Sequence, residues 1–224
     1  MKRMIRIKQV VIMAMFFVFV APSVLWADDK AAPGSKPATR LAVLPFQAVA
    51  PDDHSSTAQC PICGSVNSAG SIVRGAEKVV QGIFTDKLRD LKNTEIISSE
   101  KAAAVYQRVS ADSLKKTLLQ TMRVAGNELR ADVLVAGYLY HYRERVGYDY
   151  SAEHPASVAF EIHLISVKDG ATLWRGIYDK TQKSLMEDVF QVSSFFKGGA
   201  KWLTARELAK LGIDEIFKTF PSVE

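Results

Sequence analysis

The 224-residue sequence lacks the motifs by which most enzymes are recognised. It contains no Gly-x-Ser-x-Gly, no His-Glu-x-x-His, no P-loop and no dinucleotide-binding pattern, so no nucleophile, catalytic zinc or phosphate-binding loop is marked. The stretch GSIVRGAEK at 70–78 has Ala76 and Glu77 where a P-loop has Lys and Ser or Thr. We therefore expect a protein that is not an enzyme.

The sequence also lacks an excess of one charge beyond its first residues. The formal net charge is +5, but Lys2, Arg3, Arg6 and Lys8 have no acidic neighbour within residues 1–27, and the rest of the chain carries only +1. Binding to nucleic acid depends on clustered Lys and Arg that neutralise phosphates. Nucleic acid is therefore excluded as an expected partner.

The amino-terminal 27 residues have the pattern of a secretory signal peptide. Basic residues precede an apolar run at 10–20 that continues to Trp26, and the small residue Ala27 is followed by polar residues. We expect cleavage after Ala27 and a periplasmic or secreted protein; the alternative is a segment retained as a membrane anchor. No Cys follows the expected cleavage point, so lipid attachment there is not expected. Peripheral membrane association and homo-oligomerisation stay open.

The rest of the chain predicts a flexible leader at 28–39 and one α/β (α+β) domain at 40–220. Apolar runs and period-two alternation predict a mixed sheet of about five strands, and apolar residues at helical spacing predict helices packed against it, in the order β-α-β-α-α-β-β-β-α. A long loop at 47–71 contains both cysteines. The expected strands are 41–46, 95–98, 131–147, 156–167 and 171–180, and the expected helices are 72–91, 99–109, 112–130 and 204–217.

Several local features accompany these elements. Asp112 is the expected N-cap of the third helix, Thr204 and Glu207 form a capping box, and Asp169 with Gly170 forms a hairpin turn. The strand at 156–167 alternates an apolar face with one that holds Glu161 and His163. We expect that second face to be the wetter one.

Three stretches in this order resemble a group of bacterial envelope proteins. LAVLPF at 41–46, LRADVLVAGY at 129–138 and KDGATLWR at 168–175 are similar to the first strand, the central strand and the last hairpin of the grouping around CsgG, LpoB and the amino-terminal domain of TolB. The resemblance implies an α/β periplasmic domain that binds other envelope proteins. It leaves the partner open, because members of the grouping do different jobs.

The most specific local feature is the sequence Cys60-Pro-Ile-Cys63-Gly64. In an oxidising compartment two cysteines at this spacing favour a disulfide. The alternative is zinc, for which the pair supplies half of the usual four ligands and His54 or a second chain would supply more. A catalytic redox role is the weakest of the three, since a reactive thiolate needs a helix N-terminus or a cationic neighbour.

Aromatic and basic residues offer two candidate protein-binding surfaces. Tyr138, Tyr140 and Tyr142 share one face of a regular strand, and the first two are expected to pack in the core. We therefore expect a non-catalytic envelope binding or assembly module, or alternatively a metal- or redox-responsive protein that uses Cys60 and Cys63. The interface candidates are Tyr142, Arg143, Arg145, Tyr148 and Tyr150 near the end of the third strand, and Phe195, Phe196 and Trp202 before the last helix.

Overall fold

The computed structural model describes residues 38–51, 55–113, 115–183 and 201–221. The expected signal peptide, His54, Phe195 and Phe196 lie outside the described residues. The described residues form one compact unit. In the part of the chain that the structure describes, no helix is long and apolar enough to cross a membrane.

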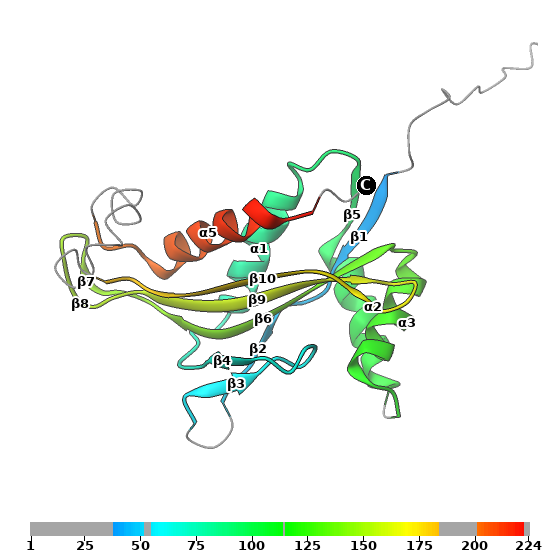
Figure 1. Cartoon of the computed structure of the whole chain (residues 1–224), viewed down its shortest axis with the longest axis horizontal. Helices are drawn as coiled ribbons and strands as arrows, with labels where there is room; N and C mark the ends of the chain where they lie inside the picture. Colours follow the sequence, from blue (N-terminus) through cyan, green and yellow to red (C-terminus); the bar gives the residue numbers. More distant parts are fainter. Residues whose placement is uncertain (1–37, 52–54, 114, 184–200, 222–224) are drawn as a thin grey trace, which may run out of the picture. The chain divides into compact units, whose positions relative to one another are not determined.

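The centre of the unit is a mixed sheet with the strand order β10-β9-β6-β1-β5 (Figure 1). β1 lies parallel to β5 and to β6, whereas β6, β9 and β10 form an antiparallel meander. The expected element order is confirmed. The strands are β1 (Thr39–Val43), β5 (Thr94–Ile97), β6 (Val133–Arg143), β9 (Ser157–Ser166) and β10 (Thr172–Thr181), and the short β2 (Gln47–Ala48) adds to the side of β6.

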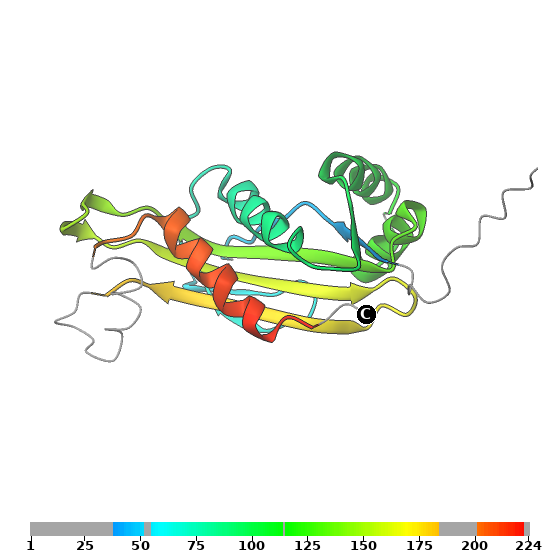
Figure 2. The ribbon, with the colours of Figure 1, turned by 90° about the horizontal axis from the view of Figure 1, so that it is seen from above.

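Two helices cover the first face of the sheet. α1 (Ala76–Leu88) and α5 (Ala205–Ile216) lie side by side above β6, β9 and β10, and the 3-10 helix η2 (Phe217–Thr219) follows α5 (Figure 2). The apolar face of β9 meets them through Val158, Phe160, Ile162 and Leu164, as its alternation predicts. The backbone at Gly137 lets the ring of Phe46 approach β6, since a Cβ there would lie 2.5 Å from ring carbons.

The second face of the sheet has two different covers. α2 (Ser99–Ala111) and α3 (Leu118–Leu129) pack at one end through Ala102, Tyr106, Met122 and Leu129. A hairpin of β3 (Thr57–Gln59) and β4 (Val66–Ser68) lies below the middle of the sheet (Figure 1). This hairpin falls within 47–71, so the expectation of an irregular loop there was wrong.

Turn chemistry explains where several elements begin and end. The Thr204–Glu207 capping box is confirmed, and so is the turn at Gly170, whose φ is +80°. The N-cap expected at Asp112 was wrong: Asp112 ends α2, and Thr117 caps α3 through a capping box with Gln120. α1 begins later than expected because the chain at 70–73 forms hydrogen bonds with β6 before Gly75 turns it into the helix.

A β-bulge in β6 changes the face on which the third tyrosine lies. Leu139 is opposite Phe160 but His141 is opposite Ala159, so Tyr140 is an extra residue on β6. Tyr140 consequently faces the hairpin, and so does His141, which is opposite Ala159 and contacts the backbone of Ser68. Tyr142 is on the α1–α5 side with 3% of its surface exposed. The expectation that Tyr142 shares a face with Tyr138 and Tyr140 was therefore wrong.

The far end of β6 continues into a small exposed ribbon. β7 (Val146–Tyr148) pairs with β8 (Ser151–His154) beyond the covered part of the sheet (Figure 1). Tyr148 and Tyr150 are 82% and 83% exposed. We call the segment Val146–His154 the β7–β8 tip.

Candidate metal centre

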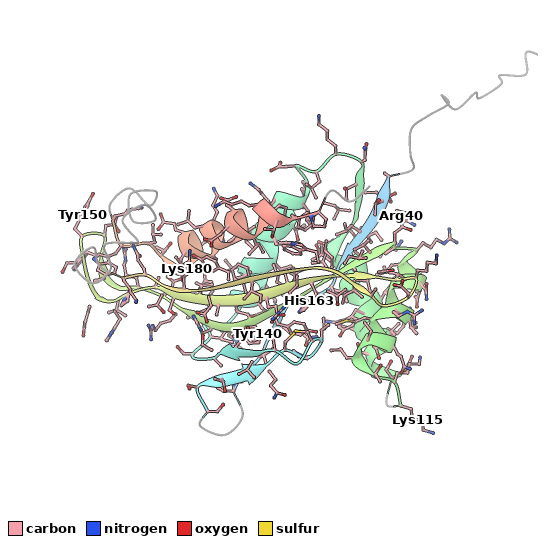
Figure 3. All side chains as sticks on the ribbon, viewed as in Figure 1. Arg40, Lys115, Tyr140, Tyr150, His163 and Lys180 are labelled. Atoms are coloured by element: carbon pink, nitrogen blue, oxygen red, sulfur yellow. The ribbon has the colours of Figure 1, made fainter. Side chains whose placement is uncertain are left out.

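Four ligand-type side chains meet between the β3–β4 hairpin and the sheet. Cys60 and Cys63 come from the hairpin, and Glu161 and His163 come from the second face of β9. One donor atom from each residue lies within 4.8 Å of the corresponding atom of every other residue. Figure 3 shows His163 and Tyr140 on this side of the sheet, facing the hairpin.

The strand β9 places its two ligands by simple alternation. Glu161 and His163 are two residues apart, so both point away from α1 and α5. Both side chains are 0% exposed. His163 is opposite Ala136 on β6 and Arg175 on β10, and the ring of Tyr138 packs edge-on against the imidazole.

The hairpin turn shapes the thiol pair. The N–H of Cys60 donates to the carbonyl of Ser65, and the N–H of Gly64 donates back to the carbonyl of Cys60. Gly64 closes the turn with φ +70°, a conformation that residues with a Cβ rarely adopt. Burial raises the pKa of the Cys60 thiol, and the backbone N–H groups of Cys63 and Ile62 oppose that rise only in part.

The donor atoms are close enough to share one ion. Cys60 Sγ lies 3.2 Å from His163 Nε2, His163 Nε2 lies 2.8 Å from Glu161 Oε1, and Cys63 Sγ lies 3.3 Å from the same oxygen. Around a tetrahedral Zn²⁺, bond lengths of about 2.0–2.3 Å place neighbouring donors about 3.3–3.8 Å apart. The three donor–donor distances given above differ from this range by about 0.5 Å or less, and the remaining donor pairs lie within 4.8 Å.

Glu161 is held in place by donors beyond the four ligand residues. Its Oε2 accepts hydrogen bonds from the Tyr140 hydroxyl at 3.0 Å, Ser65 Oγ at 3.1 Å and Asn67 Nδ2 at 3.2 Å. Its Oε1 forms a salt bridge with Arg175 Nε. Arg175 also donates to Ser65 Oγ at 2.6 Å, so one guanidinium joins the hairpin to β9. These contacts fix the carboxylate before any ion binds.

The surroundings keep the carboxylate ionised and the thiol of Cys60 protonated. Burial raises the pKa of Glu161, but hydrogen bonds from His163, Arg175 and Cys63 outweigh it and hold that pKa well below its usual range. Burial raises the pKa of Cys60 despite the two backbone N–H groups, and the nearby Glu161 raises it further. An ion at the site would supply the positive charge that a buried thiolate needs.

The charges balance once a divalent ion is present. Two thiolates and the Glu161 carboxylate carry three negative charges, and Zn²⁺ with Arg175 carries three positive ones. Zinc accepts thiolate, imidazole and carboxylate in one tetrahedral site. The four residues therefore fit zinc, which would be held by Cys60 Sγ, Cys63 Sγ, His163 Nε2 and Glu161 Oε1.

The two cysteines that the sequence singles out are part of this cluster, and both are free thiols in the structure. Glu161 and His163 were missed as ligands. We expected their face of β9 to be wet, whereas the hairpin and its polar side chains bury it. One sequence feature could have identified them: a carboxylate and an imidazole two residues apart on a strand that is otherwise almost entirely apolar.

The predicted interface residues separate into several groups. Tyr148, Tyr150 and Arg143 are exposed. Arg145 donates to Asp149 Oδ1 at 2.7 Å and to the carbonyl of Trp202, so its guanidinium joins the β7–β8 tip to the segment before α5. Trp202 is half-buried, and its N–H donates to the carbonyl of Asp149.

Comparisons with known proteins give remote similarities only. No protein-family model matches the chain, and no curated protein matches it. Similar solved structures include the PelC dodecamer from Paraburkholderia phytofirmans, at 14% identity and a TM-score of 0.44, covering 83% of this chain and 89% of that one. They also include the LpoB C-terminal domain from Salmonella enterica, at 13% identity and a TM-score of 0.36, covering 67% and 88%.

The lipoprotein GNA1162 from Neisseria meningitidis is a third, at 10% identity and a TM-score of 0.40, covering 72% of this chain and 98% of that one. LpoB is one of the proteins that the sequence resembles, and the resemblance to CsgG and TolB stays a prediction. Identities and TM-scores this low carry no argument about function.

Proposed function

We propose that this chain is a non-catalytic module of the bacterial cell envelope that binds one zinc ion at Cys60, Cys63, Glu161 and His163. The observation that carries the proposal is the convergence of four zinc-type donors from two distant parts of the chain. The ion fastens the β3–β4 hairpin to β9. The predicted signal peptide supports the envelope as its location.

A structural role for the ion follows from the number of protein ligands. Catalytic zinc sites keep one coordination position for water or substrate, whereas structural sites use four protein ligands. Here the chain supplies four, and Tyr140, Ser65, Asn67 and Arg175 surround the carboxylate. The ion would accordingly stabilise the fold and leave no position for a substrate.

Metal analysis of the purified full chain tests this proposal. We expect about one zinc per chain, and loss of at least about tenfold in affinity for His163→Gln and for Glu161→Gln, because each removes one of four ligands. The matched controls are His154→Gln and Glu153→Gln, whose side chains are 64% and 76% exposed. Zinc content near zero in the wild type, or an equal loss in the controls, would contradict the site.

A second function, protein binding at the β7–β8 tip, is favoured by a separate observation. Tyr148 and Tyr150 are almost fully exposed, with Val146 half-exposed beside them, at the end of the unit farthest from α2 and α3 (Figure 3). Tyr is enriched at the centres of protein interfaces because it combines a large apolar surface with a hydroxyl. We propose that this tip contacts an envelope protein.

Crosslinking in the cells of origin tests the tip. A crosslinked product of the wild-type chain should fall by at least about fivefold in the Tyr148→Ser/Tyr150→Ser variant, the loss expected for removing interface tyrosines worth about 1 kcal/mol or more. The control is Leu173→Ser/Ile177→Ser, which removes exposed apolar side chains from β10. Equal loss of the product in both variants would argue against a specific surface.

A further inference from the structure

The two thiols of the metal centre differ in their access to solvent. Cys63 is exposed, whereas Cys60 is 2% exposed and lies against His163 and Tyr140. Access determines which sulfur of a pair meets a reaction partner, and the buried sulfur then acts on its neighbour. The geometry therefore assigns different roles to the two residues.

We propose that the centre is a redox-controlled zinc site, in which thiol–disulfide exchange at Cys63 forms the Cys60–Cys63 disulfide and releases the ion. This inference rests on the proposed zinc site. The co-reactant is a disulfide of a small thiol or of an oxidoreductase. Exposure of Cys63 allows such a disulfide to approach, and Cys60, three residues away in the same turn, is placed to resolve the intermediate.

The exchange has two steps. The Cys63 sulfur attacks the reagent disulfide, which breaks the reagent S–S bond, forms a mixed disulfide and releases one thiolate of the reagent. The Cys60 sulfur then attacks Cys63 Sγ, forms the intramolecular disulfide and releases the second thiolate. Two electrons pass from the protein sulfurs to the reagent, and zinc leaves as Zn²⁺ because it has lost both sulfur ligands.

Loss of the ion is transmitted to the β3–β4 hairpin. The described contacts that hold the hairpin on the sheet are mostly polar: Ser65 with Arg175, Asn67 with Glu161, and Ser68 with Asp179. Few apolar side chains support them, since Ala58 and Cys60 are buried but Val66 is 63% exposed.

Release of zinc would therefore loosen the hairpin, which covers Tyr138, Tyr140 and His163.

Titration of the zinc-loaded full chain with oxidised glutathione tests the inference. We expect one zinc released for each disulfide formed, measured with a colorimetric zinc indicator and by loss of two hydrogens in intact mass spectrometry. Disulfide formation with zinc retained, or zinc release with both thiols still reduced, would overturn it. The zinc content is measured before the titration. If the purified protein holds no zinc at that stage, the proposed zinc-binding function is contradicted, and the redox inference is not the part that failed.

Single cysteine variants separate the two roles. Cys60→Ser, which keeps the exposed Cys63, should accumulate the mixed disulfide with glutathione. Cys63→Ser, which keeps the buried Cys60, should react at least about tenfold more slowly because the reagent cannot reach the sulfur. Equal rates for the two variants would refute the assignment of Cys63 as the attacking residue. Thiol counting after denaturation confirms that each variant carries one cysteine.

Discussion

Chelation of zinc from the loaded protein is expected to lower its free energy of unfolding by about 2.7 kcal/mol, if the loaded sample holds free zinc at a hundred times the dissociation constant. The reason is that the assembled site exists in the folded chain only, since Cys60 and His163 lie 103 positions apart in the sequence. Denaturant titration with and without a chelator measures the difference. The Cys60→Ser/Cys63→Ser variant is the control and should not respond.

Hydrogen exchange shows where the lost stability is located. In chelator, the amides of Cys60, Gly64 and Ala69 should exchange faster, because their hydrogen bonds lie within the β3–β4 hairpin and its base. The amides of β6 and β9, in the middle of the sheet, serve as the internal reference. If exchange became faster across the whole sheet, or did not become faster in the hairpin, the ion would not be what holds the hairpin on the sheet.

Glu161→Ala is expected to destabilise the metal-free protein by about 3 kcal/mol. Removing one partner of a buried ion pair costs about 3–5 kcal/mol, and the lower end applies because the Arg175 side chain is 33% exposed and regains water. The Tyr140 hydroxyl also loses the acceptor of its described side-chain hydrogen bond, inside the core. Urea unfolding in the presence of chelator isolates this effect from the loss of zinc.

Glu153→Ala is the matched control for that substitution. The Glu153 side chain is 76% exposed, so its loss should change stability by less than about 0.5 kcal/mol. If Glu161→Ala were as stable as the control, the carboxylate would contribute nothing to the metal-free fold. The network of Arg175, Ser65, Asn67 and Tyr140 would then need another explanation.

The main sheet and its helices follow from patterns within short stretches of the sequence. Val158, Phe160, Ile162 and Leu164 alternate and meet the α1–α5 face as predicted. The Thr204–Glu207 box and the Gly170 turn depend on contacts within a few residues, so they were readable directly. The bulge at Tyr140 could not be predicted from the sequence, because an extra residue is defined only by comparison with the residues of the paired strand.

The metal centre could be predicted from the sequence only in part, because its ligands come from two distant parts of the chain. Cys60 and Cys63 are visible in the sequence because one turn holds both. Glu161 is 98 positions from Cys63, and nothing along the chain between them indicates that a hairpin lies over β9. His54, which proximity in the sequence favoured as a third ligand, lies outside the described residues.

The sequence by itself determined the class of the fold, the order of the elements and the pair of thiols, because periodicity, capping and turn residues act over a few positions. The tertiary structure decided which residues join that pair, that Tyr142 is buried and that the second face of β9 is buried as well. The ligand set and the burial of that face depend on the hairpin packing over β9, a contact between parts of the chain about a hundred residues apart. The burial of Tyr142 depends on the bulge in β6, which only the pairing with β9 defines.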